Sequence, residues 1–183
     1  MLTKCKICVA KTAGFCFGVD RAVKIVYNEL DKRNNVVTLG PIIHNPNVVS
    51  DLEAKGVYST DVDKVTKDQT VVIRSHGVGL DVYEKLAKVG AEVIDATCPF
   101  VARIHKIAAE KSGEGGHCSG ESYVFSSCDD FENLVKEKDF SSKKVAILAQ
   151  TTYNKNMWRK CEELFERYLP EAVVYNTICI ATS

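Results

Sequence analysis

Short apolar runs alternate with amphipathic stretches along most of the chain. Residues 36–40 (VVTLG), 70–75 (TVVIRS) and 92–96 (EVIDA) are short runs rich in apolar residues, a pattern typical of buried strands. Between these runs, residues 18–33 and 79–90 carry apolar side chains at helical spacing, which predicts amphipathic helices. Strands that alternate with helices in this way predict an α/β fold, in which helices cover both faces of parallel sheets.

The same alternation continues in a second set of elements that begins near Pro99. A strand is also expected at the start of the chain, over residues 6–11, and a helix after the loop 41–45. The further elements are helices over residues 99–111, 129–138 and 154–169, and strands over residues 123–127, 144–150 and 172–176. The sequence therefore predicts two small α/β domains, over residues 1–97 and 98–178.

The most reactive side chains each follow a predicted strand at its carboxyl end. They are Cys16, His44, His76, Cys98, Thr151 and Cys179. Open α/β sheets bind ligands at this edge, where helix N-termini also offer free backbone N–H groups. One histidine or thiol alone in such a loop is more often structural, but the repeated placement predicts a binding site at the edge of the sheets.

The charge balance excludes several classes of partner. The chain has 24 basic and 24 acidic side chains and a formal net charge of zero, so no excess positive charge attracts nucleic acid or an anionic membrane. No apolar run is long enough to span a bilayer, and the first residues lack the apolar core of a secretory signal. We therefore expect a cytoplasmic protein, in which an anionic ligand needs a local site.

The eight cysteines are expected to be thiols, because the cytoplasm is reducing. Cys5 and Cys8 form a CxxC pair, but a strand would turn them to opposite faces, and no second pair follows. Cys161 lies among apolar residues at helical spacing and is interpreted as a buried structural thiol, while Cys118 and Cys128 have no clear partner. The three thiols at strand ends are too few for a closed structural zinc site but suit a metal centre with an open position.

Six motifs occur in order along the chain: GFCFGVDRAV, GPIIHNPNVV, RSHGV, VIDATCP, AQTT and TICIAT. In this order and at comparable spacings, they resemble the 4-hydroxy-3-methylbut-2-enyl diphosphate reductase family, the last enzymes of the non-mevalonate isoprenoid route. The resemblance covers almost the whole chain and implies three small α/β domains around a central cavity. It also implies a [4Fe-4S] cluster held by Cys16, Cys98 and Cys179, in which one iron lacks a protein ligand and binds the hydroxyl oxygen of the substrate.

By the same resemblance, His44 and His76 bind the diphosphate of the substrate, and Thr151 is a catalytic and substrate-binding contact near its hydroxyl end. The implied reaction is reductive dehydroxylation of 4-hydroxy-3-methylbut-2-enyl diphosphate to isopentenyl and dimethylallyl diphosphate. Ferredoxin, flavodoxin or a similar protein would donate the electrons. Two other interpretations stay open: an inactive remnant that keeps a cluster or another metal, and an α/β scaffold whose cysteines are all free thiols.

The sequence departs from the family pattern at two places. After the helix that ends at Lys111, the family continues with a strand and a loop of the form HPEVxGxxG, which carries a further diphosphate-binding histidine and a proton-relaying glutamate. No counterpart follows Lys111 here, so we expect the domain over residues 98–178 to lack a strand and loop near residues 112–117. Residues 179–183 would begin the third domain of the family, which we expect to be missing.

Overall fold

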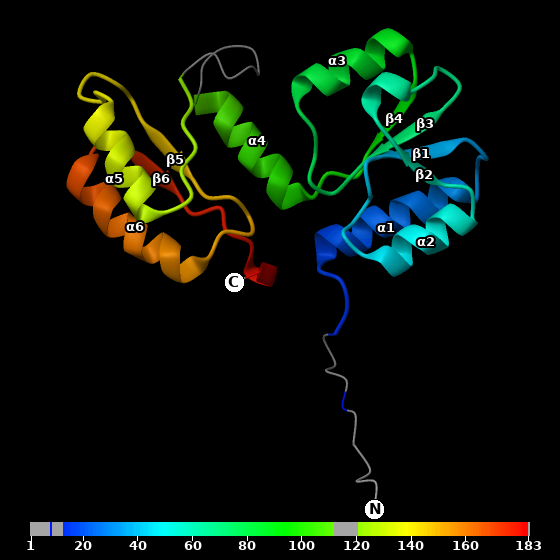
Figure 1. Ribbon diagram of the computed structural model, residues 1–183, viewed down its shortest axis with the longest axis horizontal. Helices are drawn as coiled ribbons and strands as arrows, with labels where there is room; N and C mark the ends of the chain where they lie inside the picture. Colours follow the sequence, from blue (N-terminus) through cyan, green and yellow to red (C-terminus); the bar gives the residue numbers. More distant parts are fainter. Residues whose placement is uncertain (1–7, 9–12, 112–120, 183) are drawn as a thin grey trace, which may run out of the picture.

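The structure is a computed structural model that describes residues 8, 13–111 and 121–182. Two α/β units lie side by side, and helix α4 (Pro99–Lys111) leads from the first to the second (Figure 1). The first unit contains α1 (Phe17–Leu30), β1 (Val36–Leu39), α2 (Pro46–Ala54), β2 (Tyr58–Thr60), the 3-10 helix η1 (Val62–Lys64), β3 (Thr70–Ile73), α3 (Leu80–Val89) and β4 (Glu92–Asp95). The strands of both units pair in parallel, which confirms the predicted α/β fold class.

The first sheet has its strands in the order β2-β1-β3-β4. The central strands β1 and β3 are buried along their whole length, because helices cover both faces of the sheet. Val36 and Val72 pack against α1 and α2, whereas Val71 and Ile73 pack against α3 and η1 on the opposite face (Figure 1). Since all four strands run the same way, the loops after them meet at one edge of the sheet.

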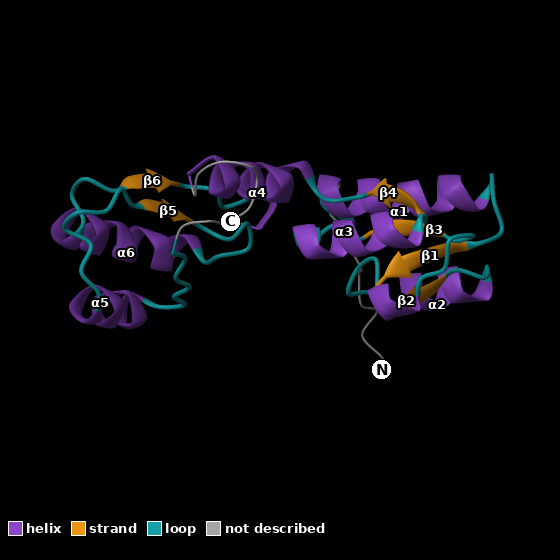
Figure 2. Cartoon of the chain, turned by 90° about the horizontal axis from the view of Figure 1, so that it is seen from above, coloured by secondary structure: helices purple, strands orange, loops and turns teal. Residues whose placement is uncertain are grey.

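The second unit holds α4, α5 (Cys128–Glu137), β5 (Ala146–Leu148), α6 (Lys155–Tyr168), β6 (Val173–Tyr175) and the 3-10 helix η3 (Ile180–Thr182). In the described part of this unit, β5 and β6 form a parallel sheet of two strands. Helices α5 and α6 lie along this sheet (Figure 2), and Phe131, Trp158 and Phe165 make T-shaped ring contacts in their shared core. A sheet this small depends on that aromatic core for its stability.

Most predicted elements are confirmed, with ends that differ by a few residues. The predicted strand over residues 123–127 is wrong, because residues 121–125 form no regular structure and the segment pairs with no other described strand. Its last residues instead begin α5: the Ser127 hydroxyl accepts a hydrogen bond from Asp130 N, and the Asp130 carboxylate accepts one from Ser127 N. Strand β2 was not predicted, because three residues are too few to show a pattern. The predicted strand over residues 6–11 lies, apart from Cys8, outside the described residues.

Candidate functional site

The start of α1 carries the first candidate thiol. Cys16 is the N-cap residue of α1, and its backbone C=O accepts a hydrogen bond from Asp20 N (2.9 Å), while its side chain caps nothing. The thiol is exposed, and its neighbours Phe15 and Phe17 expose 46% and 64% of their surface. The Cys16 thiol and both aromatic side chains are therefore accessible to a ligand.

Cys98 lies beside the same helix end. The segment that follows β4 stays beside the segment that follows β3, since Cys98 N donates a hydrogen bond to Ser75 O (2.9 Å). The Cys98 thiol then lies so close to Gly18 that a Cβ atom at this glycine would be 2.4 Å from Cys98 Sγ. Because Gly18 has no side chain, the Cys98 thiol can pack against α1 at this residue. Gly18 lies two residues after Cys16 in the sequence.

A hydrogen-bond network around Asp95 fixes the β4–α4 connection, and its residues were not among those predicted to be functional. The Asp95 carboxylate accepts hydrogen bonds from Thr97 N (2.7 Å) and Tyr83 Oη (2.8 Å), and Arg21 Nη1 donates to Thr97 O (3.2 Å). Burial by itself would raise the pKa of Asp95, but the bonds from Thr97 and Tyr83 and the charge of Arg21 hold the pKa below its usual value. Burial and the bond to Asp95 raise the pKa of Tyr83 to about 12, so this hydroxyl remains a donor at neutral pH. Arg21 lies in the motif GFCFGVDRAV and Asp95 in the motif VIDATCP. Their place in these motifs was the sequence signal that could have indicated a role for them.

His44 and His76 lie side by side beyond the carboxyl ends of β1 and β3. Their ring centroids are 5.3 Å apart, with the ring planes inclined by 49°. Arg74 approaches the same edge, and its Nε atom is buried without a hydrogen-bond partner among the described residues. Partial burial, followed by the nearby charges of Arg74 and His44, lowers the pKa of His76. Basic groups that repel one another in this way are suited to bind an anion.

Thr151 and Cys179 lie side by side at the carboxyl edge of the second sheet. Cys179 N donates a hydrogen bond to Thr151 O (2.8 Å), and the Thr177 hydroxyl donates to Ala149 O. The Cys179 side chain is half-buried and forms no disulfide, and its neighbour Ile180 exposes 86% of its surface. This end of the second unit is turned towards the first unit, and the start of α1 lies on the side of the first unit that faces the second (Figure 1).

The structure thus brings the candidate residues together in two groups. The first unit holds Cys16, His44, His76 and Cys98, and the second unit holds Thr151 and Cys179. In residues 8, 13–111 and 121–182, no three His, Cys, Asp or Glu side chains are close enough together to hold a metal ion. The thiols of Cys16, Cys98 and Cys179 have the chemistry of iron–sulfur ligands, but in the described part of the chain they do not form one metal-binding group.

Residues 7–183 match the family model of the LytB protein. The curated 4-hydroxy-3-methylbut-2-enyl diphosphate reductases of Caldanaerobacter subterraneus subsp. tengcongensis and Aquifex aeolicus are 38% and 36% identical to the chain, over 97% of its length. This chain belongs to the LytB family. No helix in the described part of this LytB chain is both long and apolar enough to cross a membrane.

Solved structures of two reductases have the same fold as this LytB chain. A structure of (E)-4-hydroxy-3-methyl-but-2-enyl diphosphate reductase, the terminal enzyme of the non-mevalonate pathway, is 36% identical and matches with a TM-score of 0.80, over 96% of this chain and 68% of its own. The E-1-hydroxy-2-methyl-but-2-enyl-4-diphosphate reductase from Plasmodium falciparum is 24% identical and matches with a TM-score of 0.81, over 94% of this chain and 60% of its own. The second likeness supports the fold alone.

The LytB relatives contain residues that have no counterpart here. The chain covers 68% of the Caldanaerobacter protein and 67% of the Aquifex protein. The alignment with the Caldanaerobacter protein runs over 200 positions, whereas this chain has 183 residues in total, so that relative has at least 17 positions inside the matched region that this chain lacks.

The contact between Gly18 and Cys98 can be tested by substitution. Gly18→Ala is expected to lower the free energy of unfolding by about 1–3 kcal/mol, because the new Cβ atom and Cys98 Sγ cannot occupy the same space. Urea denaturation followed by circular dichroism measures this loss. In the double variant Gly18→Ala with Cys98→Ala the loss should be smaller than the sum of the two single losses, and additive losses would contradict the contact.

The lowered pKa of His76 predicts how the first unit responds to pH. In the unfolded chain a histidine titrates near pH ~6.5, so the unfolded state binds more protons than the folded state as the pH falls below that value, and stability decreases towards acid. An NMR titration should give a midpoint for His76 below ~6.5. Arg74→Gln should raise this midpoint, whereas Arg159→Gln, on α6 of the second unit, should leave it unchanged. An unchanged midpoint in Arg74→Gln would refute the electrostatic contribution of Arg74.

Proposed function

We propose that this chain is a 4-hydroxy-3-methylbut-2-enyl diphosphate reductase, which forms isopentenyl and dimethylallyl diphosphate by reductive dehydroxylation. Its LytB family membership supports the reductase activity. The observation that carries the proposal is the carboxyl edge of the first sheet, where Gly77, next to His76, packs against Thr97, next to Cys98. The histidine pair and the Cys98 thiol therefore belong to adjoining loops. This edge would offer basic groups for a diphosphate beside one of the proposed cluster ligands.

The diphosphate would bind at His44 and His76. Helix α3 begins shortly after His76, but Asp81 places a carboxylate in its first turn, so the two histidines and Arg74 would supply the positive charge for the anion. An anion placed between the two imidazoles favours their charged forms and would raise the lowered pKa of His76. Protonation and substrate binding would therefore strengthen each other. This local site accounts for an anionic substrate on a chain with zero net charge.

Cys16, Cys98 and Cys179 would hold a [4Fe-4S] cluster in which one iron has no protein ligand. When bound, such a cluster supplies single electrons and a Lewis-acidic iron for the hydroxyl oxygen. Cys179 belongs to the second unit and the other two thiols to the first, so these residues would join the units. The exposed side chains of Phe15 and Ile180, beside two of the thiols, would help to keep water away from the site.

Thr151 would contact the substrate near its hydroxyl end. The hydrogen bond from Cys179 N to Thr151 O keeps these two residues together, and this pairing supports the assignment. Ferredoxin, flavodoxin or a similar protein would donate the electrons. A second candidate function, an inactive protein that keeps a cluster or another metal, is favoured by one observation: Lys111 is not followed by a counterpart of the HPEVxGxxG segment.

The proposed ligands can be tested by iron binding. Serine at Cys16, Cys98 or Cys179 should remove most of the charge-transfer absorbance of the anaerobically reconstituted protein, because each thiolate would bind iron directly. Serine at Cys8, an exposed thiol, or at Cys161, which is buried in the aromatic core of the second unit, should leave the absorbance intact. If Cys8 proves necessary, the interpretation of the CxxC pair is wrong. An unaltered spectrum in all three proposed ligand variants would refute the cluster site.

The rate of turnover distinguishes the two candidate functions. With the allylic diphosphate and a strong one-electron donor under anaerobic conditions, the chain should turn over about 10²–10⁴-fold more slowly than the Caldanaerobacter relative, because the proton-relaying glutamate expected from the family pattern has no counterpart after Lys111. A cluster spectrum without any turnover would favour the inactive protein. An equal rate would show that another residue replaces the family glutamate, and Glu121→Gln would be the first variant to assay.

A further inference from the structure

Strand β5 has one edge that pairs with no described strand. Its register with β6, together with the hydrogen bond from Val173 N to Val145 O, directs the backbone groups of Val145 and Ile147 towards β6. In a parallel ladder alternate residues bond to opposite sides, so the N–H and C=O groups of Ala146 and Leu148 point away from β6. These groups form a short, regular row of donors and acceptors, which is the pattern that another strand recognises.

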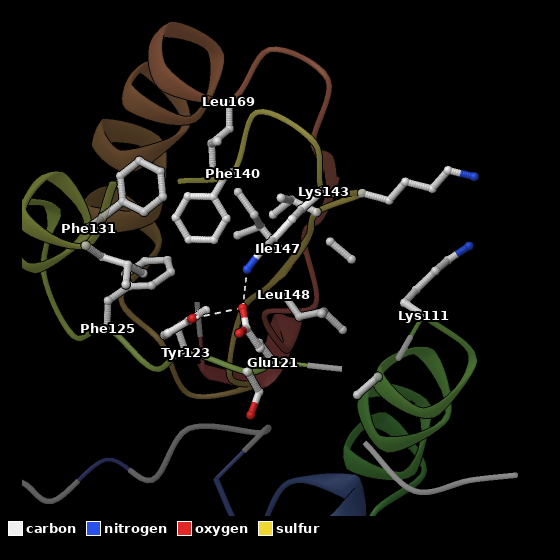
Figure 3. A pocket seen from close by; sticks show the side chains of 16 residues that line it. Lys111, Glu121, Tyr123, Phe125, Phe131, Phe140, Lys143, Ile147, Leu148 and Leu169 are labelled. Carbon is white, nitrogen blue, oxygen red and sulfur yellow. Dashed lines mark hydrogen bonds and ion pairs between the residues drawn. The ribbon is translucent and has the colours of Figure 1, made fainter. Parts of the chain in front are cut away.

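An apolar cavity of about 640 Å³ lies against this free edge (Figure 3). Residues 143–148 all line it, although alternate side chains of a strand point to opposite faces, so the cavity follows the backbone edge of β5 and not one of its faces. The aromatic side chains of Phe125, Phe131 and Phe140 line its other wall, as Figure 3 shows. The cavity therefore combines an unpaired strand edge with an apolar wall.

The cavity carries positive charge. Lys111 and Lys144 line it, and neither forms an ion pair with another described residue. Lys143 also lines it but is paired with the Glu121 carboxylate, which in addition accepts a hydrogen bond from Tyr123 Oη (3.1 Å; Figure 3). A ligand with acidic groups would match the two remaining charges.

We propose that this cavity binds an extended apolar peptide segment with acidic ends, which adds to β5 as a third strand and is supplied by another polypeptide. An extended segment satisfies the N–H and C=O groups of Ala146 and Leu148, buries the aromatic wall and places carboxylates near Lys111 and Lys144. A compact apolar molecule would satisfy the wall but not the backbone.

The test uses one defined probe, a fluorescein-labelled peptide of sequence Asp-Val-Thr-Val-Thr-Val-Thr-Asp, whose β-branched residues favour an extended conformation. Its fluorescence anisotropy should rise and saturate as the full chain is added. A peptide with lysine in place of both aspartates, and one with proline in place of the central valine, should bind roughly tenfold or more weakly, because they lose the charge match or the backbone pairing.

Hydrogen exchange then identifies the edge that the peptide occupies. The amides of Ala146 and Leu148 should become protected when the peptide binds. The amide of Ile147 already faces β6 and should change little, so it serves as an internal control within the same strand. Protection confined to other parts of the chain, or no protection, would overturn the proposal.

Two variants test the edge and the charge. Ala146→Pro removes a donor that β6 does not use and places a ring at the free edge, a position where proline is tolerated, so it should abolish binding while circular dichroism stays unchanged. Lys144→Glu should weaken binding roughly fivefold. Its matched control, Lys160→Glu on α6, does not line the cavity and should bind as the unaltered chain does.

Equal binding by Ala146→Pro, if folded, would overturn the proposal, and so would the absence of saturable binding by the unaltered chain up to about millimolar concentration. If Ala146→Pro does not fold, the alternation of exchange between Ala146, Ile147 and Leu148 in the unaltered chain decides the question. The assay contains no iron and no diphosphate. Its outcome is therefore independent of the reductase function.

Discussion

Hydrogen bonding between β3 and the chain that follows β4 is the constraint on which the site in the first unit depends. Ala96 N donates to Ile73 O (3.0 Å) and Cys98 N donates to Ser75 O (2.9 Å), so parallel pairing persists beyond the end of the strand. This pairing carries Cys98 to the start of α1, where Gly18 leaves room for its thiol. A backbone constraint of this kind positions a reactive side chain more rigidly than a free loop would.

Electrostatics in the first unit are local, because the net charge of the chain is zero. The Asp95 carboxylate is held below its usual pKa by hydrogen bonds from Thr97 and Tyr83 and by Arg21, so it stays charged and keeps the β4–α4 connection in place. A short distance away, partial burial lowers the pKa of His76, and the nearby charges of Arg74 and His44 lower it further. The same edge therefore combines a satisfied acidic group, which supports the fold, with an unsatisfied basic group, which favours an anion.

The two units differ in how completely their sheets are covered. In the first unit, helices on both faces bury β1 and β3, and the strand edges that matter for the site are paired. In the second, α5 and α6 supply an aromatic core, while the edge of β5 that pairs with no described strand borders a cavity of about 640 Å³. A two-stranded sheet has little stability of its own, so anything that pairs with this edge would also stabilise the unit that carries Thr151 and Cys179.

The sequence by itself determined the α/β class, most of the elements and the placement of His44, His76, Cys98, Thr151 and Cys179 at strand ends, because hydrophobic periodicity is a local property. It could not exclude a strand over residues 123–127, since strand pairing needs a neighbour that local pattern does not reveal. Only the tertiary structure decided that the two histidine rings lie 5.3 Å apart, that Arg21 and Tyr83 support the Cys98 loop, and that the backbone of Cys179 is hydrogen-bonded to that of Thr151 on the second unit. These contacts join residues far apart in the chain, and their distances depend on how whole sheets and helices pack.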